Sequence, residues 1–513
     1  MIINNQDNIR KNANFGNSVG ALATSTMNFL ATNEAIGATT VDAASMVFPR
    51  TAIDYTRTPE AGTETLRREV VSCLLYAGLG LFGLAAGFAL APFSSAREYN
   101  VPLHKITAGD SEITAMASSW NKALNKGKNK DEVVDSYLRE IIDSISGVDK
   151  DKSISIISDK GPHKEEIITE LKTMLLDEKN GYNFDADKKH KLIQKIIHTT
   201  GSSENLELKL HDKTIKTKAA DLLDNTYILG RTFMSPKVEQ EFKKGNCDKF
   251  LNSLKNLNGR KMILGLGVAS AFALSMQAIN RWMTQKKTGS SGFVAYKGEP
   301  GKKDTSFNFQ AMKAAATAGM GALMLGSITG FKNPIKNLKN LPRELQFTKI
   351  MPNLSQYKLA YGVTIMGRFL ASSDQNELRE SATRDFLGFA SWLIFGDVAA
   401  RGIAKMFEKS KGVSLLNRQK NDGKPLNLMN SYLKTHEEII YANSEKNTLG
   451  KTVKEAYKSV SNPAKKALKY RNIAQLGGYL VSGLLLGVAI PLFNKAVTDN
   501  LQKKKIAEQK ITA

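Results

Sequence analysis

The sequence predicts a mainly α-helical protein, specifically a polytopic helical membrane protein of four or five spans with an inserted soluble helical domain. Three observations carry this prediction. Four uncharged segments are each 18 to 27 residues long, close to the roughly 20 residues that a transmembrane helix needs. The residues between the first two segments are polar and show helical periodicity. With two cysteines and six histidines among 513 residues, the chain lacks the composition of a disulfide framework or a cysteine-rich zinc protein.

The two longest uncharged segments are the first and the last of the four along the chain. Residues 70–96 form a run of 27 residues without a charge, and residues 472–494 form a run of 23. As a helix the first run is about 40 Å long, enough to cross a hydrocarbon core of about 30 Å with some tilt. Both runs are therefore predicted to be transmembrane helices. Pro491, inside the second run, is expected to kink it.

Two further uncharged segments are weaker candidates for transmembrane helices. Residues 262–280 and 314–331 contain 19 and 18 residues without a charge, but they are rich in Ala, Gly, Ser and Met. We expect each to span the membrane. A buried core helix of a large soluble protein is the alternative for both.

A fifth apolar segment, residues 386–400, contains a charge. A carboxylate near the middle of a span costs about 2.5–3.5 kcal/mol on insertion scales. Asp397 and Arg401 are four residues apart, so on a helix they share a face and could pair. They form a candidate intramembrane polar site. The segment either crosses the membrane against other helices or lies in the interface.

Small residues recur at helical spacing in three of the apolar segments. Gly-x-x-x-Gly pairs occur at Gly83 and Gly87, at Gly326 and Gly330, and at Gly483 and Gly487. Such pairs let helix backbones approach closely in lipid. The sequence therefore predicts helix packing at these positions, within the chain or between copies in a homo-oligomer.

The polar region 97–261 is predicted to be a soluble helical domain. Apolar residues recur at helical spacing over 131–145 and 164–176, and a third such pattern begins at Leu192. Residues 205–218 alternate between polar and apolar side chains around a short polar turn. They predict a β-hairpin.

The positive charge lies mainly in the last part of the chain. The net charge is +23, and residues 281–513 contain 37 basic and 16 acidic side chains. The basic clusters lie between apolar segments, which favours anionic lipid headgroups over nucleic acid as partners. Solvation of the loops is the plainer interpretation of the same lysines. Every interval after the first segment is basic, so the positive-inside rule yields no orientation.

Motifs for chemistry were tested and rejected. Residues 78–83 match Gly-x-Gly-x-x-Gly, but a dinucleotide site needs a strand before the turn, and this match lies within an uncharged run. The group His436-Glu437-Glu438 lacks the second histidine of a zinc protease. We therefore expect no catalytic residues, no cofactor and no metal site. The polar opening of the chain predicts no cleavable signal peptide, with residues 70–96 acting as an uncleaved anchor.

One internal similarity accompanies these segments. The motif Glu-x-x-x-Arg-(Glu/Asp) occurs at residues 64–69, before the first apolar run, and at residues 380–385, before the segment that contains Asp397. The two copies are 316 residues apart. Internal repeats are common in membrane transporters. Chance similarity in a biased sequence is the alternative.

The predicted order along the chain follows from these segments. It comprises a polar and small-residue N-terminal region (1–69), a transmembrane helix (70–96), a soluble mostly helical domain (97–261), two weaker transmembrane helices with a basic connecting loop (262–331), a basic region with the apolar helix 386–400 (332–471), a transmembrane helix (472–494) and a basic C-terminal tail (495–513).

The predicted function is that of a multi-pass membrane protein without enzymatic activity, a scaffold or assembly subunit, because no catalytic constellation is found in the sequence. A transporter or channel that uses Asp397 and Arg401 is the alternative, since intramembrane ionisable residues often line transport pathways. A secreted protein that inserts into a foreign membrane is the second alternative. The expected partners are the lipid bilayer, with its anionic headgroups, and a second copy of the chain. No nucleic acid is expected.

Overall fold

The computed structural model describes residues 5–32, 37, 39–41, 43–148, 153–156, 163–199, 205–211, 213–289, 291–296, 303–331, 337–348, 352–391, 395–418, 425–442 and 453–512. The protein is mainly helical, as predicted. It divides into two compact units. Unit 1 contains residues 1–32, 88–258 and 400–476, and unit 2 contains residues 33–87, 259–399 and 477–513.

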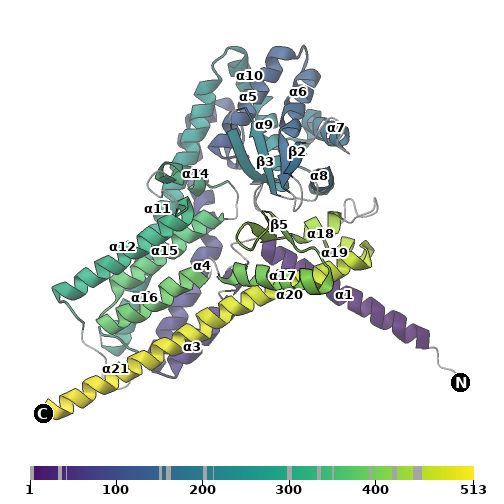
Figure 1. Cartoon of the computed structure of the whole chain (residues 1–513). Helices are drawn as coiled ribbons and strands as arrows, with labels where there is room; N and C mark the ends of the chain where they lie inside the picture. The colour runs from purple at the N-terminus through teal and green to yellow at the C-terminus, as the bar shows by residue number, and fades with distance from the viewer. Residues whose placement is uncertain are drawn as a thin grey trace. The chain divides into compact units, whose positions relative to one another are not determined.

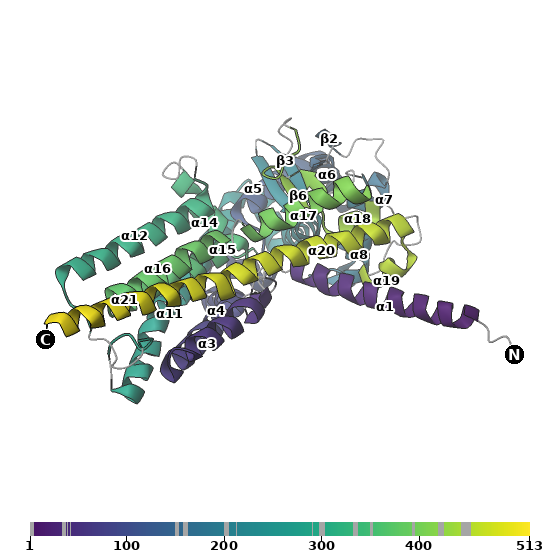
Figure 2. The ribbon, with the colours of Figure 1, turned by 60° about the horizontal axis from the view of Figure 1, so that its bottom comes forward.

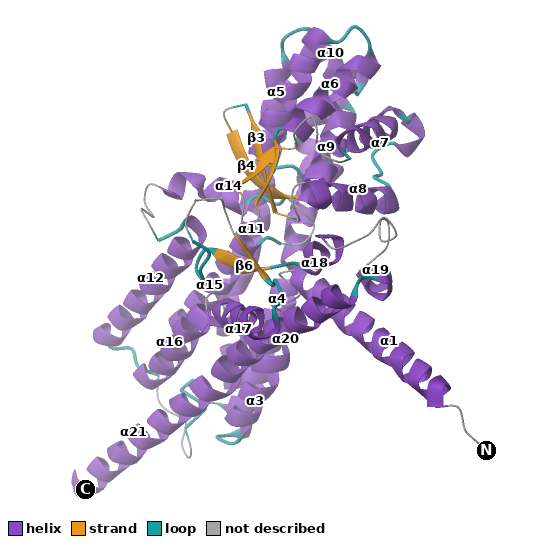
Figure 3. Ribbon diagram, turned by 45° about the vertical axis from the view of Figure 1, so that its right-hand side comes forward, coloured by secondary structure: helices purple, strands orange, loops and turns teal. Residues whose placement is uncertain are grey.

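Unit 1 contains a four-stranded antiparallel sheet in the order β2-β1-β3-β4 (Figure 3). Its strands are β1 (Ile145–Val148), β2 (Ser153–Ile156), β3 (Asn205–Leu210) and β4 (Lys213–Lys218). The pairing of β3 with β4 confirms the predicted hairpin. The sequence did not predict β1 and β2.

The prediction of a helix over residues 131–145 was wrong at its end. Helix α6 ends at Asp143, and Ile145 begins strand β1 opposite Leu208 of β3. The N–H of Lys209 donates to the carbonyl of Ser144 at 3.0 Å. The free edge of β3 therefore gains a partner strand, and the ladder stabilises residues that helical periodicity alone assigns to a helix.

Helices surround the sheet in unit 1. Trp120 of α5, Tyr137 of α6 and Phe233 of α9 are fully buried, and the ring centroids of Trp120 and Tyr137 lie 5.2 Å apart. The elements that contribute to this unit are α1 (Asn5–Thr32), α5 (Asp110–Lys126), α6 (Lys130–Asp143), α7 (Lys164–Leu176), α8 (Ala186–Thr199), α9 (Ala219–Phe233), α10 (Pro236–Lys243), α18 (His436–Ala442), α19 (Val453–Ser459), the hairpin β5 (Leu416–Arg418) and β6 (Ser431–Leu433), and the short turns η2 (Ala91–Phe93), η3 (Ser95–Tyr99), η4 (Leu103–Lys105) and η5 (Glu178–Asn180).

Unit 2 is a bundle of helices. Figure 1 shows α12 and α15 side by side, and Figure 2 shows α16 along α21. The elements of this unit are η1 (Ala43–Val47), α3 (Phe48–Tyr55), α12 (Phe307–Thr329), η6 (Leu338–Asn340), α14 (Leu341–Leu345), α15 (Leu354–Ala371), α16 (Gln375–Ala390), η9 (Leu485–Ala489) and α21 (Ile490–Thr512). Four helices contribute residues to both units, namely α4 (Pro59–Leu90), α11 (Cys247–Thr288), α17 (Gly396–Lys411) and α20 (Asn462–Leu484).

Four helices are long and apolar enough to cross a membrane. Among the described residues they are Pro59–Phe93, Cys247–Thr288, Phe307–Thr329 and Asn462–Lys504. The second and fourth contain the uncharged segments 262–280 and 472–494, and the first and third contain all but the last two or three residues of the segments 70–96 and 314–331. In the last of them, α20 changes at Leu485 into the π-helical turn η9 just before Pro491. Since proline lacks an N–H, the regular hydrogen-bond ladder is interrupted at this position, and a π-helical turn is a common way to absorb the irregularity.

Candidate functional site

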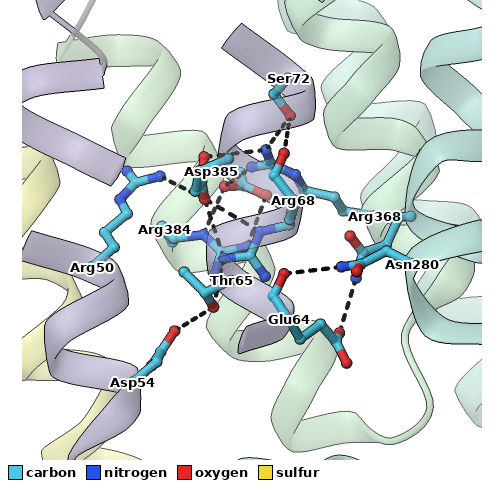
Figure 4. Close-up of polar contacts among 12 residues, drawn as sticks. Arg50, Asp54, Glu64, Thr65, Arg68, Ser72, Asn280, Arg368, Arg384 and Asp385 are labelled. Carbon is cyan, nitrogen blue, oxygen red and sulfur yellow. Dashed lines mark hydrogen bonds and ion pairs between the residues drawn. The ribbon is translucent and has the colours of Figure 1, made fainter. Parts of the chain in front are cut away.

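A buried ionic network lies in unit 2 (Figure 4). Glu69 of α4 is its first centre. The Glu69 carboxylate lies 3.3 Å from Arg50 of α3, 3.1 Å from Arg68 of its own helix and 3.6 Å from Arg368 of α15. Glu69, Arg50 and Arg368 are all buried. Charged groups in such a setting are retained only when they are paired and hydrogen-bonded.

The second centre is Asp385 of α16. Its Oδ1 lies 3.1 Å from Arg368 Nη1 and 2.9 Å from Arg384 Nε. Burial disfavours the charged form of Asp385, but the positive charges of Arg384 and Arg368 outweigh this effect and hold the pKa of the carboxyl below its usual range. Arg368 thus contacts both Glu69 and Asp385, and it joins α4 to α16.

Two further ion pairs extend the network. Arg57 donates to both carboxylate oxygens of Glu380, at 2.8 and 2.6 Å, and Arg281 of α11 pairs with Glu377. Burial again opposes ionisation of Glu380, but the hydrogen bond and charge of Arg57 keep its pKa below the ordinary value. For Glu377, burial prevails and raises the pKa even though Arg281 is its partner.

In each half of the network, a capping side chain stabilises the first turn of a helix. The Oγ1 of Thr58 accepts a hydrogen bond from the N–H of Ala61 at 3.0 Å where α4 begins. Asp374 Oδ1 accepts from the N–H of Glu377 at 2.9 Å where α16 begins. Both are N-cap hydrogen bonds of the ordinary kind. The two capping residues are 316 residues apart, which is also the distance between the two motifs noted in the sequence.

A third helix packs against each motif, α11 against the first and α21 against the second, and these two helices share a sequence pattern. Asn-(Arg/Lys)-x-x-Thr occurs at residues 280–284 on α11 and at residues 494–498 on α21. Asn280 Nδ2 donates to the main-chain oxygen of Glu64 at 3.0 Å, and Asn494 Nδ2 donates to the main-chain oxygen of Glu380 at 2.9 Å. The same side chain thus makes the same contact with the first residue of each motif.

Unit 2 therefore contains one polar arrangement twice. We call α3, α4 and α11 repeat A, and α15, α16 and α21 repeat B. In each, an arginine of the first helix pairs with the last residue of the motif, Arg50 with Glu69 and Arg368 with Asp385. The N-termini of α4 and α16 both lie at the network.

The first glutamates of the two motifs have different partners. Glu380 accepts two hydrogen bonds from Arg57 and one from Thr498. Glu64 accepts one hydrogen bond through Oε1, from Gln277 Nε2 at 3.2 Å, while its Oε2 is buried and has no hydrogen-bond partner. Glu64 is only 5% exposed.

A small cavity adjoins both glutamates. Its volume is about 30 Å³, which is room for one or two water molecules rather than for an organic substrate. Ionisable groups from both repeats line it together with a short apolar segment. The lining residues are Asp54, Arg57, Ala61, Glu64, Thr65, Arg68, Phe293, Val294, Ala295, Glu377, Glu380, Ser381 and Arg384.

The candidate site residues predicted from the sequence lie elsewhere. Asp397 is exposed on α17, in unit 2. Arg401 is buried and belongs to unit 1, where its Nη1 donates to the main-chain oxygens of Leu428 and Ser431. Within the predicted apolar segment, 386–390 belong to α16 and 396–400 to α17, while 392–394 lie outside the described residues.

The predicted glycine pairs have different surroundings. A Cβ on Gly83 would overlap Phe347, and one on Gly87 would lie 3.3 Å from the Lys261 side chain. Gly483 and Gly487 both face Ser45, and at Gly487 the neighbour is the main-chain oxygen. A Cβ on Gly326 would lie 2.7 Å from Phe331, whereas Gly330 ends α12 with φ +88°.

The buried network was largely missed by sequence reasoning. The motif at 64–69 and 380–385 was its only signal. Of the arginines that complete it, Arg281 borders the uncharged segment 262–280, whereas Arg50, Arg57 and Arg368 border none of the four uncharged segments. Among the described residues, no group of three or more His, Cys, Asp or Glu side chains could hold a metal ion.

No protein-family model matches this chain, and comparisons with curated proteins and with solved structures also find no significant match. The structure itself defines the class, a mainly helical protein with four helices long and apolar enough to cross a membrane.

Proposed function

We propose that this chain is a multi-pass integral membrane protein without enzymatic activity, a scaffold or assembly subunit whose helical unit 2 lies in the bilayer. The observation that carries the proposal is the distribution of side chains in unit 2. Large apolar residues point outward, with Leu74 at 66%, Ile263 at 69% and Leu484 at 63% exposed. The charged residues of the network are inside.

This distribution suits lipid better than water. Soluble proteins rarely expose large contiguous apolar patches, whereas ionisable residues in membrane proteins face the bundle interior and pair with one another. Unit 1 has a large buried apolar core that includes Trp120, Tyr137 and Phe233. Unit 1 is proposed to be the water-exposed part, which a scaffold would present to its partners.

The network supports a structural role rather than catalysis. Its arginines pair with carboxylates across α3, α4, α11, α15 and α16, and Arg379 of α16 donates to the hydroxyl of Thr498 on α21. The adjoining cavity is too small for an organic substrate. Paired charges that join helices favour one arrangement of the bundle over others. The lysine-rich intervals are proposed to contact anionic headgroups at the bilayer surface.

Alkaline carbonate extraction tests the membrane proposal. Membranes from cells expressing the full chain should retain it in the pellet. Labelling with a membrane-impermeant maleimide tests the two units separately, because the chain has two cysteines, Cys73 in unit 2 and Cys247 in unit 1. With Cys73→Ser and Cys247→Ser as matched variants, Cys247 should react in intact membranes and Cys73 only after detergent is added. Release by carbonate, or equal labelling of both thiols in intact membranes, would contradict the proposal.

A transporter is the second candidate, and the lining of the cavity favours it. Ionisable side chains of both repeats meet there, and internal repeats occur in known transporter folds. The residues that would serve transport are then those of the cavity, such as Glu64 and Glu377. Flux assays in liposomes containing the purified chain test this candidate, with Glu64→Gln as the variant and Asp397→Asn as the control.

A further inference from the structure

The exposed part of α11 has the length of a bilayer. Large apolar side chains are exposed along this helix from Ile263 to Met283, a stretch of about 30 Å, which is the thickness of a typical hydrocarbon core. Exposed cations lie just beyond it, Arg260 at what we call the first end of unit 2 and Lys286 at the second end. The Lys286 ammonium lies 5.5 Å from the centroid of the Trp282 ring. Cations and tryptophan at the limits of an apolar stretch are typical of membrane–water interfaces.

Helix α4 runs antiparallel to α11 between the same two ends. Near the first end, a Cβ on Gly87 would lie 3.3 Å from the Lys261 side chain. At the second end, Arg67 Nη2 donates to Thr284 Oγ1 at 2.6 Å. Both helices are long and apolar enough to cross a membrane. Together they mark two levels with which the ends of other helices can be compared.

Helix α15 extends from one level to the other. Phe347, shortly before the helix begins, lies against Gly83 of α4 and Gly265 of α11 near the first end. Ser373, just after the helix, accepts a hydrogen bond from Arg281 of α11 at the second end, at 3.1 Å. The helix has 18 residues and is therefore about 27 Å long. It has the reach of a transmembrane helix, although it is not among the four found by length and hydropathy.

Three of those four helices surround α15. Its contacts with α4, α11 and α12 join Tyr357 to Tyr76, Gly367 to Leu274 and Gly362 to Met324. At Gly367 the neighbour is a main-chain oxygen, 2.7 Å from an added Cβ. Leu354 and Leu370, at the two ends of α15, are its exposed large apolar side chains. The helix is thus covered by protein over most of its length.

The charges on α15 explain why its hydropathy is low. Lys358 Nζ donates to the main-chain oxygen of Ser327 on α12 at 2.7 Å. Arg368 pairs with Glu69 and Asp385. Both charges thus have partners inside the bundle, which is where ionisable residues of membrane helices are tolerated.

We propose that α15 crosses the bilayer as a further transmembrane helix, which reaches both surfaces of the membrane but is shielded from lipid by α4, α11 and α12. This inference rests on the proposed location of unit 2 in the bilayer. It puts the connection between α12 and α15 on one side of the membrane. The connection between α11 and α12 and the start of α16 then lie together on the opposite side.

Single-cysteine labelling tests this arrangement. The reporters are Thr305→Cys before α12, Lys339→Cys between α12 and α15, and Gln375→Cys after α15, each in the full chain with Cys73→Ser and Cys247→Ser. All three positions are exposed, so the substitutions leave the packing of the bundle intact. Sealed membrane vesicles are treated with a membrane-impermeant maleimide before and after detergent is added. Labelling of the denatured chain gives the total, and the chain without cysteine is the blank.

Lys339→Cys should behave oppositely to the other two reporters. If Lys339→Cys reacts in sealed vesicles, Thr305→Cys and Gln375→Cys should react only after detergent, and the reverse holds for vesicles of the opposite orientation. Gln375→Cys on the same side as Lys339→Cys, with protection of one side until detergent is added, would overturn the inference and leave the membrane proposal standing. Full labelling of all three reporters without detergent, together with release of the chain by carbonate, would overturn both.

Discussion

Arg57 and Glu380 form a two-bonded salt bridge, with nitrogen–oxygen distances of 2.8 and 2.6 Å, although 323 residues separate them in the chain. Arg57 lies between α3 and α4, just before repeat A's motif, and Glu380 is the first residue of repeat B's motif. The pair therefore links the two repeats directly. Arg368, which contacts Glu69 and Asp385, links them a second time.

The first prediction concerns this pair. Arg57→Met leaves the buried Glu380 without its cation and should lower the free energy of unfolding by about 3–5 kcal/mol. Glu380→Leu leaves the buried Arg57 with the more distant carboxylate of Asp54, 3.6 Å away. The double variant Arg57→Met/Glu380→Leu should lose less than the sum of the two single changes, because neither charge is left alone. Denaturant unfolding in detergent measures the cycle, and strictly additive losses would contradict the coupling.

The second prediction concerns helix packing at Gly487. An added Cβ would overlap the main-chain oxygen of Ser45 in η1, and a main-chain atom cannot move aside as a side chain does. Gly487→Ala should therefore destabilise unit 2 by about 1–3 kcal/mol. Gly267→Ala on α11 is the control, since no atom lies within 4 Å of its added Cβ. Alanine favours a helix over glycine, so the control should be neutral or stabilising. Equal effects of the two changes would refute this account.

The third prediction separates Asp397 from Arg401. Asp397 is exposed, so Asp397→Asn should change the free energy of unfolding by no more than about 0.5 kcal/mol. Arg401 is buried, and its guanidinium donates to the carbonyls of Leu428 and Ser431. Arg401→Met should cost about 2–3 kcal/mol, because it removes charge-assisted hydrogen bonds to buried acceptors. Thermal unfolding of both variants measures the two effects; a large loss from Asp397→Asn would contradict this account.

The fourth prediction concerns acid stability through His436 in unit 1. Burial, together with the charge of Arg471, holds the pKa of His436 well below its ordinary value, and Nε2 lies 2.6 Å from Asn472 Oδ1. The folded state therefore keeps the imidazole neutral, while the unfolded chain takes up a proton near pH 6.5. As the pH falls below this value, the free energy of unfolding should decrease by up to about 1.4 kcal/mol per pH unit.

His436→Asn removes this titration. Its unfolding free energy should vary less with pH between 6.5 and 5 than that of the parent chain, as pH-dependent unfolding would measure, although the variant itself is less stable at pH 7. A parent chain with flat stability across this range would show that the histidine is not buried in its neutral form.

Much of the helical layout could be predicted from the sequence. The four uncharged runs became helices long enough to cross a membrane, and the periodicity over 164–176 and the alternation over 205–218 became a helix and a hairpin. Local patterns decide such elements, because an apolar run or a fixed period limits what its own residues can form. Strand β1 was missed because its stability comes from β3, about 60 residues further along the chain.

The charged core is a different case. By itself, the sequence determined that Glu-x-x-x-Arg-(Glu/Asp) occurs twice, each time before an apolar run. Only the tertiary structure decided that Arg50, Arg57 and Arg368 turn inward and pair with carboxylates from distant helices, and that Glu64 lacks the guanidinium of its counterpart Glu380. The reason is physical. The hydropathy of a residue indicates whether its side chain prefers water or an apolar environment. A buried charge, however, is tolerated only when it has a partner of opposite charge, and only the fold brings that partner near.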